Sequence, residues 1–313
     1  MSGHLLALGL GNSLLWSLYL LLTRHVVSGA RLDAWAYTLV QVLTAGLVLL
    51  WLGRRVVGSW FELLAPWTIG YAFLRVAING ATAASITWLA ITESTLLATV
   101  SVLIGAGSGW WLQRKAPARR DWPGLALLAA GIVMFALALA PEAWRGLGWL
   151  VVSEAMAVAA SWMIAYHPRN RLTDLAARSR FTGEILVAAS LALILVWSAL
   201  GLTGAVASPW AGAGDAFGRI ELWLYAALAG LLFRAPGTWL GFWTINRTGV
   251  QTYLIALATM PFFAIALEAA AAHFGWVAPP NLSALEWIAA AVILAASSWL
   301  IVARMKAPPA AAP

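Results

Sequence analysis

The sequence predicts an all-α membrane protein with ten transmembrane helices, arranged as two inverted five-helix repeats around a central cavity. The chain has 313 residues, of which 62% are hydrophobic and only 10% are charged, and its mean hydropathy is +0.84. This chain has too few polar side chains to cover the surface of a soluble domain of the same length. Two further observations support this fold class: ten long apolar segments, and a similarity between the first five and the last five.

Each apolar segment is close to the length needed to cross a bilayer. About 20 residues of helix span a hydrocarbon core of about 30 Å. The segments are 4–22, 34–52, 68–90, 95–112, 123–140, 147–166, 182–204, 221–243, 249–272 and 285–304. The first has no basic stretch before it and no small-residue cleavage site after it, so we expect a retained span rather than a signal peptide.

The last five segments align with the first five in the same order. The matched positions are 15–17 with 161–163, Gln41 with Glu184, 91–94 with 245–248, and 121–122 with 286–287. An odd number of spans per repeat places the second copy upside down, a layout in which the substrate site lies between the halves near mid-membrane. We therefore predict one repeat over 1–142, a second over 143–306, and a disordered tail at 307–313.

The positive charge of the chain follows the predicted loops. If the N-terminus is cytoplasmic, 13 of the 19 Lys and Arg residues lie in inner loops, four lie in outer loops, and Arg75 and Arg234 lie inside segments. The positive-inside rule then places both termini in the cytoplasm. The net charge of +7 thus reflects topology, and we expect no nucleic-acid partner. The expected location is the cell membrane, of the bacterial inner-membrane type.

Residue types required for most enzyme chemistry are missing or scattered. The chain has no cysteine and only four histidines, and no metal-ligand spacing links them. A Ser/His/Asp set at one depth, a nucleotide-binding loop and a His-x-x-x-His motif are also missing. We therefore expect no metal, no cofactor and no enzymatic activity.

Several short patterns resemble a known family. They are the stretch from Leu15-Trp16-Ser17-Leu18-Tyr19 to Thr23-Arg24, an aspartate before the second segment (Asp33), the stretches 88–102 and 123–131, and Met260-Pro261. Together they are similar to EamA-like members of the drug/metabolite transporter superfamily over about 5–305. The resemblance implies ten helices and a central cavity lined mainly by segments 1, 3, 4, 6, 8 and 9.

The chain departs from the family pattern at three places. Gly105-Ala106-Gly107 stands where the fourth span usually has a proline, and Gln113-Arg114-Lys115 stands where a glutamate usually follows that span. Gln41 replaces an arginine that is usual in the second span.

Arg234 is the strongest candidate for a substrate-binding residue. An ionised side chain at mid-span costs roughly 2.5–3.5 kcal/mol on insertion scales, and Pro236 and Gly237 after it favour a hinge. We interpret Arg234 as an anion-binding or gating residue; the alternative is a structural ion pair with Glu154 or Glu184. The aligned stretch 80–83 carries no charge, which points to an asymmetry between the halves.

Arg75 and Glu154 are the other two deeply placed charges. Arg75, with Asn79 one turn later, can bind substrate, form an ion pair or extend to the cytoplasmic interface. Glu154 is a candidate for proton coupling, and the alternative is a fixed partner for an arginine. Glu184 and Glu268 lie nearer the ends of their segments, where we expect them to reach interfacial water.

Three polar or aromatic residues of the first segment share one helical face. Asn12, Trp16 and Tyr19 recur at spacings of four and three, so this face can line the cavity or pack against another helix. Pro261 in the ninth segment predicts a second hinge, because bilayer helices tolerate such breaks where neighbours compensate.

These observations favour a secondary transporter that works by alternating access. We expect it to move a small organic metabolite, anionic or amino-acid-like, in the direction of efflux. The alternative on the same scaffold is a flippase for a lipid or a lipid-linked sugar. The expected partners are the small-molecule substrate and the bilayer, and we expect a monomer or a homodimer.

Overall fold

The computed structural model describes residues 3–56, 64–114, 116–167, 174–202 and 214–305. All regular elements in these ranges are helices, and the described residues contain no strand. The predicted disordered tail, 307–313, lies outside the described residues.

Each of the ten predicted segments coincides with a helix or with two helices in line. The helices are α1 (Gly3–Arg24), α2 (Ala34–Leu52), α4 (Pro66–Ile86), α5 (Ile91–Ala98) followed by α6 (Val100–Gln113), α7 (Trp122–Ala138), α8 (Ala143–Tyr166), α9 (Leu175–Leu202), α10 (Ile220–Ala229) followed by α11 (Ala235–Thr248), α12 (Val250–Leu257) followed by α13 (Met260–His273), and α14 (Ala284–Met305). Within the described residues, seven of these stretches are long and apolar enough to cross a membrane. The all-α membrane class is therefore confirmed.

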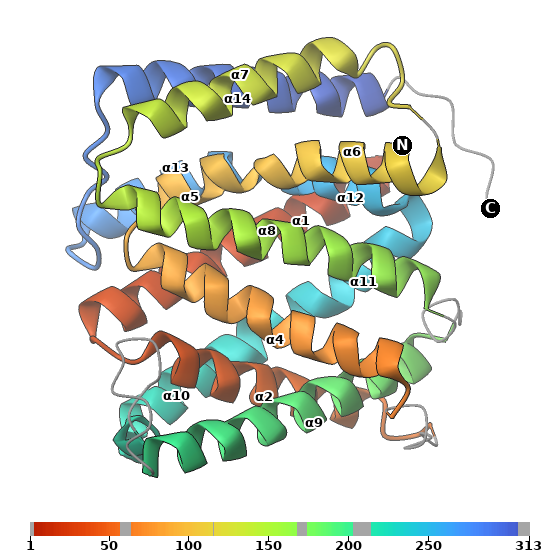
Figure 1. The fold of residues 1–313 in the computed structure, drawn as a ribbon, viewed down its shortest axis with the longest axis vertical. Coiled ribbons are helices and arrows are strands. Elements are labelled where there is room, and N and C mark those ends of the chain that lie inside the picture. Colours follow the sequence, from red (N-terminus) through yellow and green to blue (C-terminus); the bar gives the residue numbers. More distant parts are fainter. Residues whose placement is uncertain (1–2, 57–63, 115, 168–173, 203–213, 306–313) are drawn as a thin grey trace.

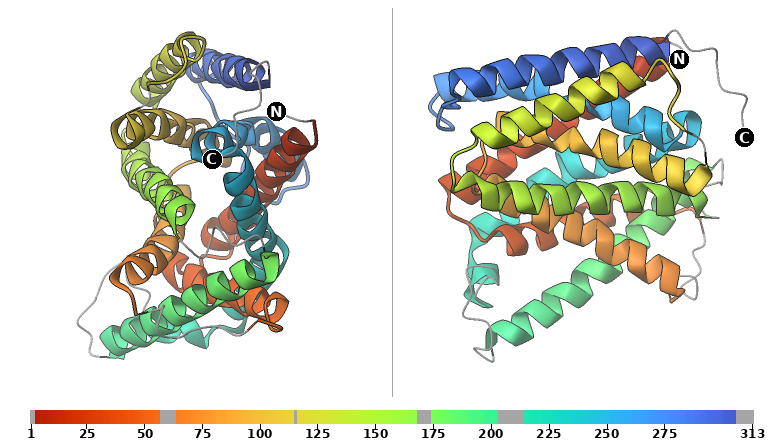
Figure 2. Two further views of the ribbon diagram at one scale, coloured as in Figure 1. Left: turned by 90° about the vertical axis from the view of Figure 1, so that its right-hand side faces the viewer. Right: turned by 45° about the horizontal axis from the view of Figure 1, so that its top comes forward.

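The helices form two layers that lie side by side. Figure 2 (left) looks along the helices and shows α4, α8, α6 and α7 in one layer and α11, α1, α12 and α14 in the other. The pair α2 and α9 closes one end of the long axis, and the pair α7 and α14 closes the opposite end (Figure 1). We call the edge where α1 begins and α14 ends the near end, and the edge where α4 joins α5 the far end.

α2 and α9 pack closely because a glycine of each helix lies at their contact. A Cβ on Gly46 would lie 2.9 Å from Val187 Cγ2, and a Cβ on Gly183 would lie 2.6 Å from the backbone nitrogen of Leu50. Small residues allow such close approach between helices in a bilayer, where packing rather than the hydrophobic effect drives association.

Two of the spans are broken in the middle, and both breaks carry a threonine. α5 and α6 are separated by Thr99, and α12 and α13 are separated by Ala258 and Thr259. The hydroxyl of Thr99 donates to the carbonyl of Leu96 at 2.6 Å, and that of Thr259 donates to Ala256 at 2.8 Å. Such bonds offer the backbone an alternative to the helical ladder. Pro261 predicted the second break, whereas the first, which has no proline, was not predicted.

The predicted irregularity at Arg234 takes the form of a π-helical turn. Gly230–Arg234 forms the π-helix η4 between α10 and α11, and Pro236 occupies one of the first two positions of α11. Proline is well suited to the start of a helix because the N–H that it lacks has no partner there. Single π-turns of this kind occur often at functional sites.

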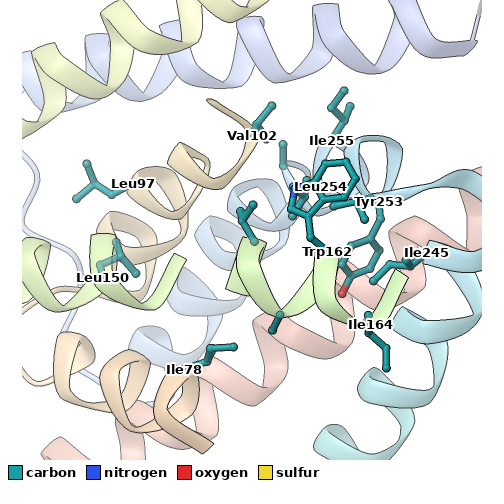
Figure 3. Close-up of a cluster of buried hydrophobic side chains, with 14 of the residues drawn as sticks. Ile78, Leu97, Val102, Leu150, Trp162, Ile164, Ile245, Tyr253, Leu254 and Ile255 are labelled. Carbon is teal, nitrogen blue, oxygen red and sulfur yellow. The ribbon is translucent and has the colours of Figure 1, made fainter. Parts of the chain in front are cut away.

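The apolar core fills the space between the two layers. Figure 3 shows part of it: Val102 and Trp162 from one layer lie by Tyr253, Leu254 and Ile255 from the other, and Leu97 and Leu150 lie farther along the same cluster. The indole of Trp162 also donates to the hydroxyl of Ser108 at 2.9 Å, which ties α8 to α6.

Candidate functional site

A cavity of about 130 Å³ lies between the two layers at the level of the helix breaks. Its walls come from α1, α4, α5 and α6, α8, η4, and α12 and α13. These are the first, third, fourth, sixth, eighth and ninth spans, the six that the family resemblance implies. Among the predicted residues, Trp16, Tyr19, Arg75, Asn79, Glu154 and Arg234 line it.

Arg234 is buried in the wall of this cavity. Its side chain is 1% exposed, and its guanidinium carbon lies 4.9 Å from the ring centre of Trp16 and 6.0 Å from that of Tyr19. The two rings meet edge to face, with centroids 5.4 Å apart. Cation–π attraction is strongest when the cation is desolvated, so these two rings position the guanidinium group.

Arg75 enters the same cavity from α4. Its Nη2 donates to the hydroxyl of Thr238 at 3.4 Å, and its guanidinium carbon lies 5.8 Å from the ring centre of Phe242. Both partners belong to α11. The Arg75 side chain therefore bridges the two layers. The predicted alternative, in which it extends to the cytoplasmic interface of the membrane, does not hold.

The ion-pair alternative for Arg234 is absent from the part of the chain that the structure describes. Glu184 pairs with Arg180 at 2.5 Å, and none of the ion pairs among the described residues involves Glu154. None of the ion pairs among the described residues involves Arg75 or Arg234. Two guanidinium groups thus line one cavity without a carboxylate partner there.

Glu154 lies on α8 with part of its side chain open to the cavity. Ser101, which also lines the cavity, follows the break at Thr99 by two residues, and its hydroxyl donates to the carbonyl of Ala98 at 2.7 Å. Glu154 therefore lines the same space as the half of the fourth span that begins at this break. Among the described residues that line the cavity, Glu154 is the one with an acidic side chain.

The remaining predicted residues mainly contact other groups of the protein. Asn12 is buried and donates to the hydroxyl of Tyr253 at 3.4 Å, outside the cavity wall. Asn79 reaches the cavity, but its amide donates to the carbonyl of Arg75 at 2.5 Å. Gly237 allows the Trp16 ring to approach, since a Cβ there would lie 3.3 Å from it. Pro261 follows Met260, which lines the cavity.

Sequence reasoning missed the neutral hydroxyl groups of the site. A smaller pocket of about 20 Å³ adjoins the cavity and shares Trp16, Arg75 and Tyr253 with it. Tyr71, which is 1% exposed, lines this pocket. Tyrosine, serine and threonine are common in membrane helices for packing reasons, so the sequence holds no signal that separates these from the rest.

The far end of the cavity is closed by a buried carboxylate. Glu268 is 0% exposed, and its two oxygens accept the backbone N–H groups of Ile91 at 3.0 Å and Thr92 at 2.8 Å. Nε of Arg24 lies 3.9 Å from the same carboxylate, and Arg24 also donates to the carbonyl of Leu89. We call Arg24, Glu268, Ile91 and Thr92 the far clasp.

The far clasp corrects one prediction. Glu268 and Glu184 were expected to reach interfacial water, but they are 0% and 2% exposed. The reason is local: Glu268 satisfies the free N–H groups at the start of α5, and Glu184 holds Arg180. Unpaired amide donors at a helix start provide such a partner for a carboxylate.

The near end is held by a second charged contact farther from the cavity. Arg304 of α14 donates to Asp121 at 2.8 Å and to Gln251 at 3.4 Å. Beside it, α6 and α12 pack closely, since a Cβ on Gly105 would lie 2.4 Å from Leu254. Neutral and apolar contacts thus close this end of the cavity itself.

The structure shows no cluster of three metal-binding side chains among the residues it describes.

Comparisons with known proteins address the fold. No protein-family model and no curated protein matches the chain. A solved crystal structure of a protein matches with a TM-score of 0.61 at 19% sequence identity, over 98% of this chain and 100% of its own. This likeness is one of fold alone. The seven long apolar helices among the described residues lead to the conclusion that the chain is a multi-pass integral membrane protein.

Proposed function

We propose that the protein is a secondary transporter of a small organic metabolite, which works by alternating access between two inverted five-helix repeats. The observation that carries the proposal is the enclosed cavity, whose walls come from the same three spans of each half. Transporters of the inverted-repeat type bind their substrates at such a position. The resemblance to EamA-like members of the drug/metabolite transporter superfamily agrees with this function.

The helix pairings support a two-fold relation between the halves. α2 packs on α9, α6 on α12 and α7 on α14, so each of these spans contacts the span five places later. The contact of α4 with α8 has a counterpart in that of α1 with α11. The two layers in Figure 2 contain corresponding spans as well.

The helix boundaries give the register of the repeat around the cavity. α5 starts at Ile91 and α12 at Val250, and these helices end at Ala98 and Leu257, a constant offset of 159. Arg75 and Arg234 each stand 16 residues before these starts. In this register the two arginines are counterparts.

This register differs from the one read from the sequence. The sequence alignment used an offset of 154 and set Arg234 opposite the uncharged Gly80. It relied on the similarity of 91–94 with 245–248, yet Ile245 lies inside α11, whereas Ile91 begins α5. In the register proposed from the helix boundaries, Arg234 has a charged counterpart in Arg75, whereas the alignment read from the sequence gave it an uncharged one.

The two ends of the cavity suggest how access alternates. Hydrogen bonds and a charge contact hold the far clasp, whereas the near end closes by packing of α6 on α12. The distribution of basic residues assigns the far end to the outside. Alternating access would break one closure while the other holds, and the proposed direction of net transport is efflux.

Single-cysteine accessibility tests this function, because the native chain has no cysteine. Ser94→Cys and Ser161→Cys place a thiol in the cavity, and Ser298→Cys places one on the exposed surface of α14 as a control. In right-side-out and inverted vesicles, a membrane-impermeant thiol reagent should label the cavity thiols from both sides. Labelling from one side alone under every condition would contradict alternating access.

A flippase is the second candidate, and one observation favours it. A groove of about 390 Å³ lies between α2, α4 and α9, and apolar side chains such as Trp35, Phe73 and Leu193 line it. An acyl chain suits such a groove. Val76 and Ala77 face the groove while Arg75 and Asn79 face the cavity, so α4 separates the two spaces. Movement of fluorescent phospholipids between leaflets of proteoliposomes would support this candidate.

A further inference from the structure

We infer that the cavity binds an oxyanion head group, a carboxylate or a phosphate, at a subsite formed by Arg234, Arg75 and Tyr71. This inference names the substrate class for the proposed transporter and so rests on the proposed function. It depends on three features: hydrogen-bond donors without partners, two like charges in contact with one space, and an apolar remainder of the cavity.

Five buried donor atoms around this subsite have no hydrogen-bond partner. They are Nε and Nη2 of Arg234, Nε of Arg75, the hydroxyl of Tyr71 and Nε1 of the adjoining Trp16. Buried polar groups in native proteins are nearly always paired, and an unpaired charged donor is the most costly kind. Each of these atoms can donate a hydrogen bond to a ligand oxygen, so a ligand that fits the subsite must supply hydrogen-bond acceptors.

The charges of the subsite point to the same ligand. Arg75 and Arg234 line the same cavity, and Arg75 and Tyr71 line the smaller pocket that adjoins it. No ion pair within the described ranges neutralises either arginine. An anion between them would replace repulsion with two attractions, and it would satisfy the free N–H groups at the same time.

The rings at Arg234 keep its hydrogen-bonding edge available. Trp16 and Tyr19 contact the guanidinium as π partners and accept no hydrogen bond from it that would occupy Nε or Nη2. A planar guanidinium held in this way presents parallel donors that match the two oxygens of a carboxylate or phosphate. The subsite is therefore positioned before a ligand arrives.

The rest of the cavity fits an apolar body attached to the anionic head. Ile78, Leu150, Leu254 and Leu257 line the remaining wall. Pockets for small molecules commonly combine a mostly apolar lining with a few placed polar groups. The substrate class is thus a small organic anion with an apolar part.

Binding to purified protein tests this inference without any transport assay. Four probes share one ring and differ in the head group: benzoate, phenyl phosphate, benzyl alcohol and benzylamine. A ligand of the folded state raises the unfolding temperature. Benzoate or phenyl phosphate should raise it and the other two should not; whichever anion acts more strongly distinguishes a carboxylate site from a phosphate site.

Variants assign the effect to the subsite. Arg234→Gln should weaken the binding of the anionic probe by about 10- to 100-fold, the range expected for a hydrogen bond to a charged group. Arg247→Gln is the matched control, because this guanidinium lies 4.4 Å from the ring centre of Trp243 and outside the cavity. If Arg234→Gln does not fold, Tyr71→Phe removes one of the free donors and should weaken binding as well.

Three outcomes would overturn the inference: equal stabilisation by benzylamine or benzyl alcohol, no stabilisation by any probe, or unchanged affinity for the anionic probe in Arg234→Gln and Tyr71→Phe. Failure of transport is a separate result. Binding of the anion with no access from one side of the membrane would contradict the transporter and leave the subsite intact.

Discussion

The carboxylate of Glu268 on α13 accepts a 2.8 Å hydrogen bond from the backbone N–H of Thr92 at the start of α5. This contact joins the broken stretch of α5 and α6 to the broken stretch of α12 and α13. It lies on the far side of Met260 and Ser94, both of which line the cavity. Its rupture would therefore be needed to open the cavity toward that end.

Removal of the carboxylate should loosen the far clasp. In Glu268→Ala the N–H groups of Ile91 and Thr92 lose their acceptor and Arg24 loses its counter-charge. We expect faster labelling of Ser94→Cys by an impermeant thiol reagent from the far side, measured in oriented vesicles. Glu286→Ala is the control, because Glu286 accepts its hydrogen bond from nearby Ser283. Equal labelling rates in both variants would mean that Glu268 does not hold the closure.

The carboxylate in the cavity should carry any coupling to protons. Glu154 lines the cavity, and none of the ion pairs among the described residues ties it to an arginine. Glu154→Gln should therefore preserve counterflow exchange in proteoliposomes and remove the dependence of net transport on a pH gradient. Glu221→Gln is the control, since Glu221 is an exposed residue whose partner is Arg219. A gradient dependence that persists in Glu154→Gln would contradict this role.

Close packing of α2 on α9 should be intolerant of a single methyl group. The Cβ of Gly183→Ala would lie 2.6 Å from the Leu50 nitrogen and 2.8 Å from the Gly46 oxygen, and these backbone atoms cannot move aside alone. We expect a loss of about 1–3 kcal/mol of stability, the usual cost of overpacking. Thermal unfolding in detergent measures it, with Gly148→Ala as the control because nothing lies within 4 Å of that position. Similar unfolding temperatures would contradict the packing argument.

The near end should depend on the contact between α7 and α14. Asp121 is 1% exposed and accepts from Arg304 at 2.8 Å. Asp121→Asn leaves Arg304 partly buried without its counter-charge, so we expect the free energy of unfolding to fall by about 3 kcal/mol. The exposed Glu142, changed to glutamine, is the control. If the two variants unfold at the same temperature, the contact contributes little to stability.

The sequence determined the class and most of the helix boundaries, because the bilayer leaves little choice. Without water in the hydrocarbon core, each spanning segment must satisfy its backbone internally. The segment predicted over 34–52 coincides with α2, and that predicted over 285–304 lies within α14. The cost of charge in the bilayer also singled out Arg75, Glu154 and Arg234, which meet in one cavity.

Only the tertiary structure decided which groups are partners. The hydrogen bonds that Glu268 accepts from α5 and the burial of the free donors of Arg234 depend on neighbours that are distant in the chain. The proposed register, in which Arg75 and Arg234 are counterparts, also rests on where α5 and α12 begin, because diffuse similarity between apolar segments aligns equally well at several offsets. Hydrophobicity fixes which segments enter the bilayer, whereas hydrogen bonds and charge between packed helices decide what they can bind.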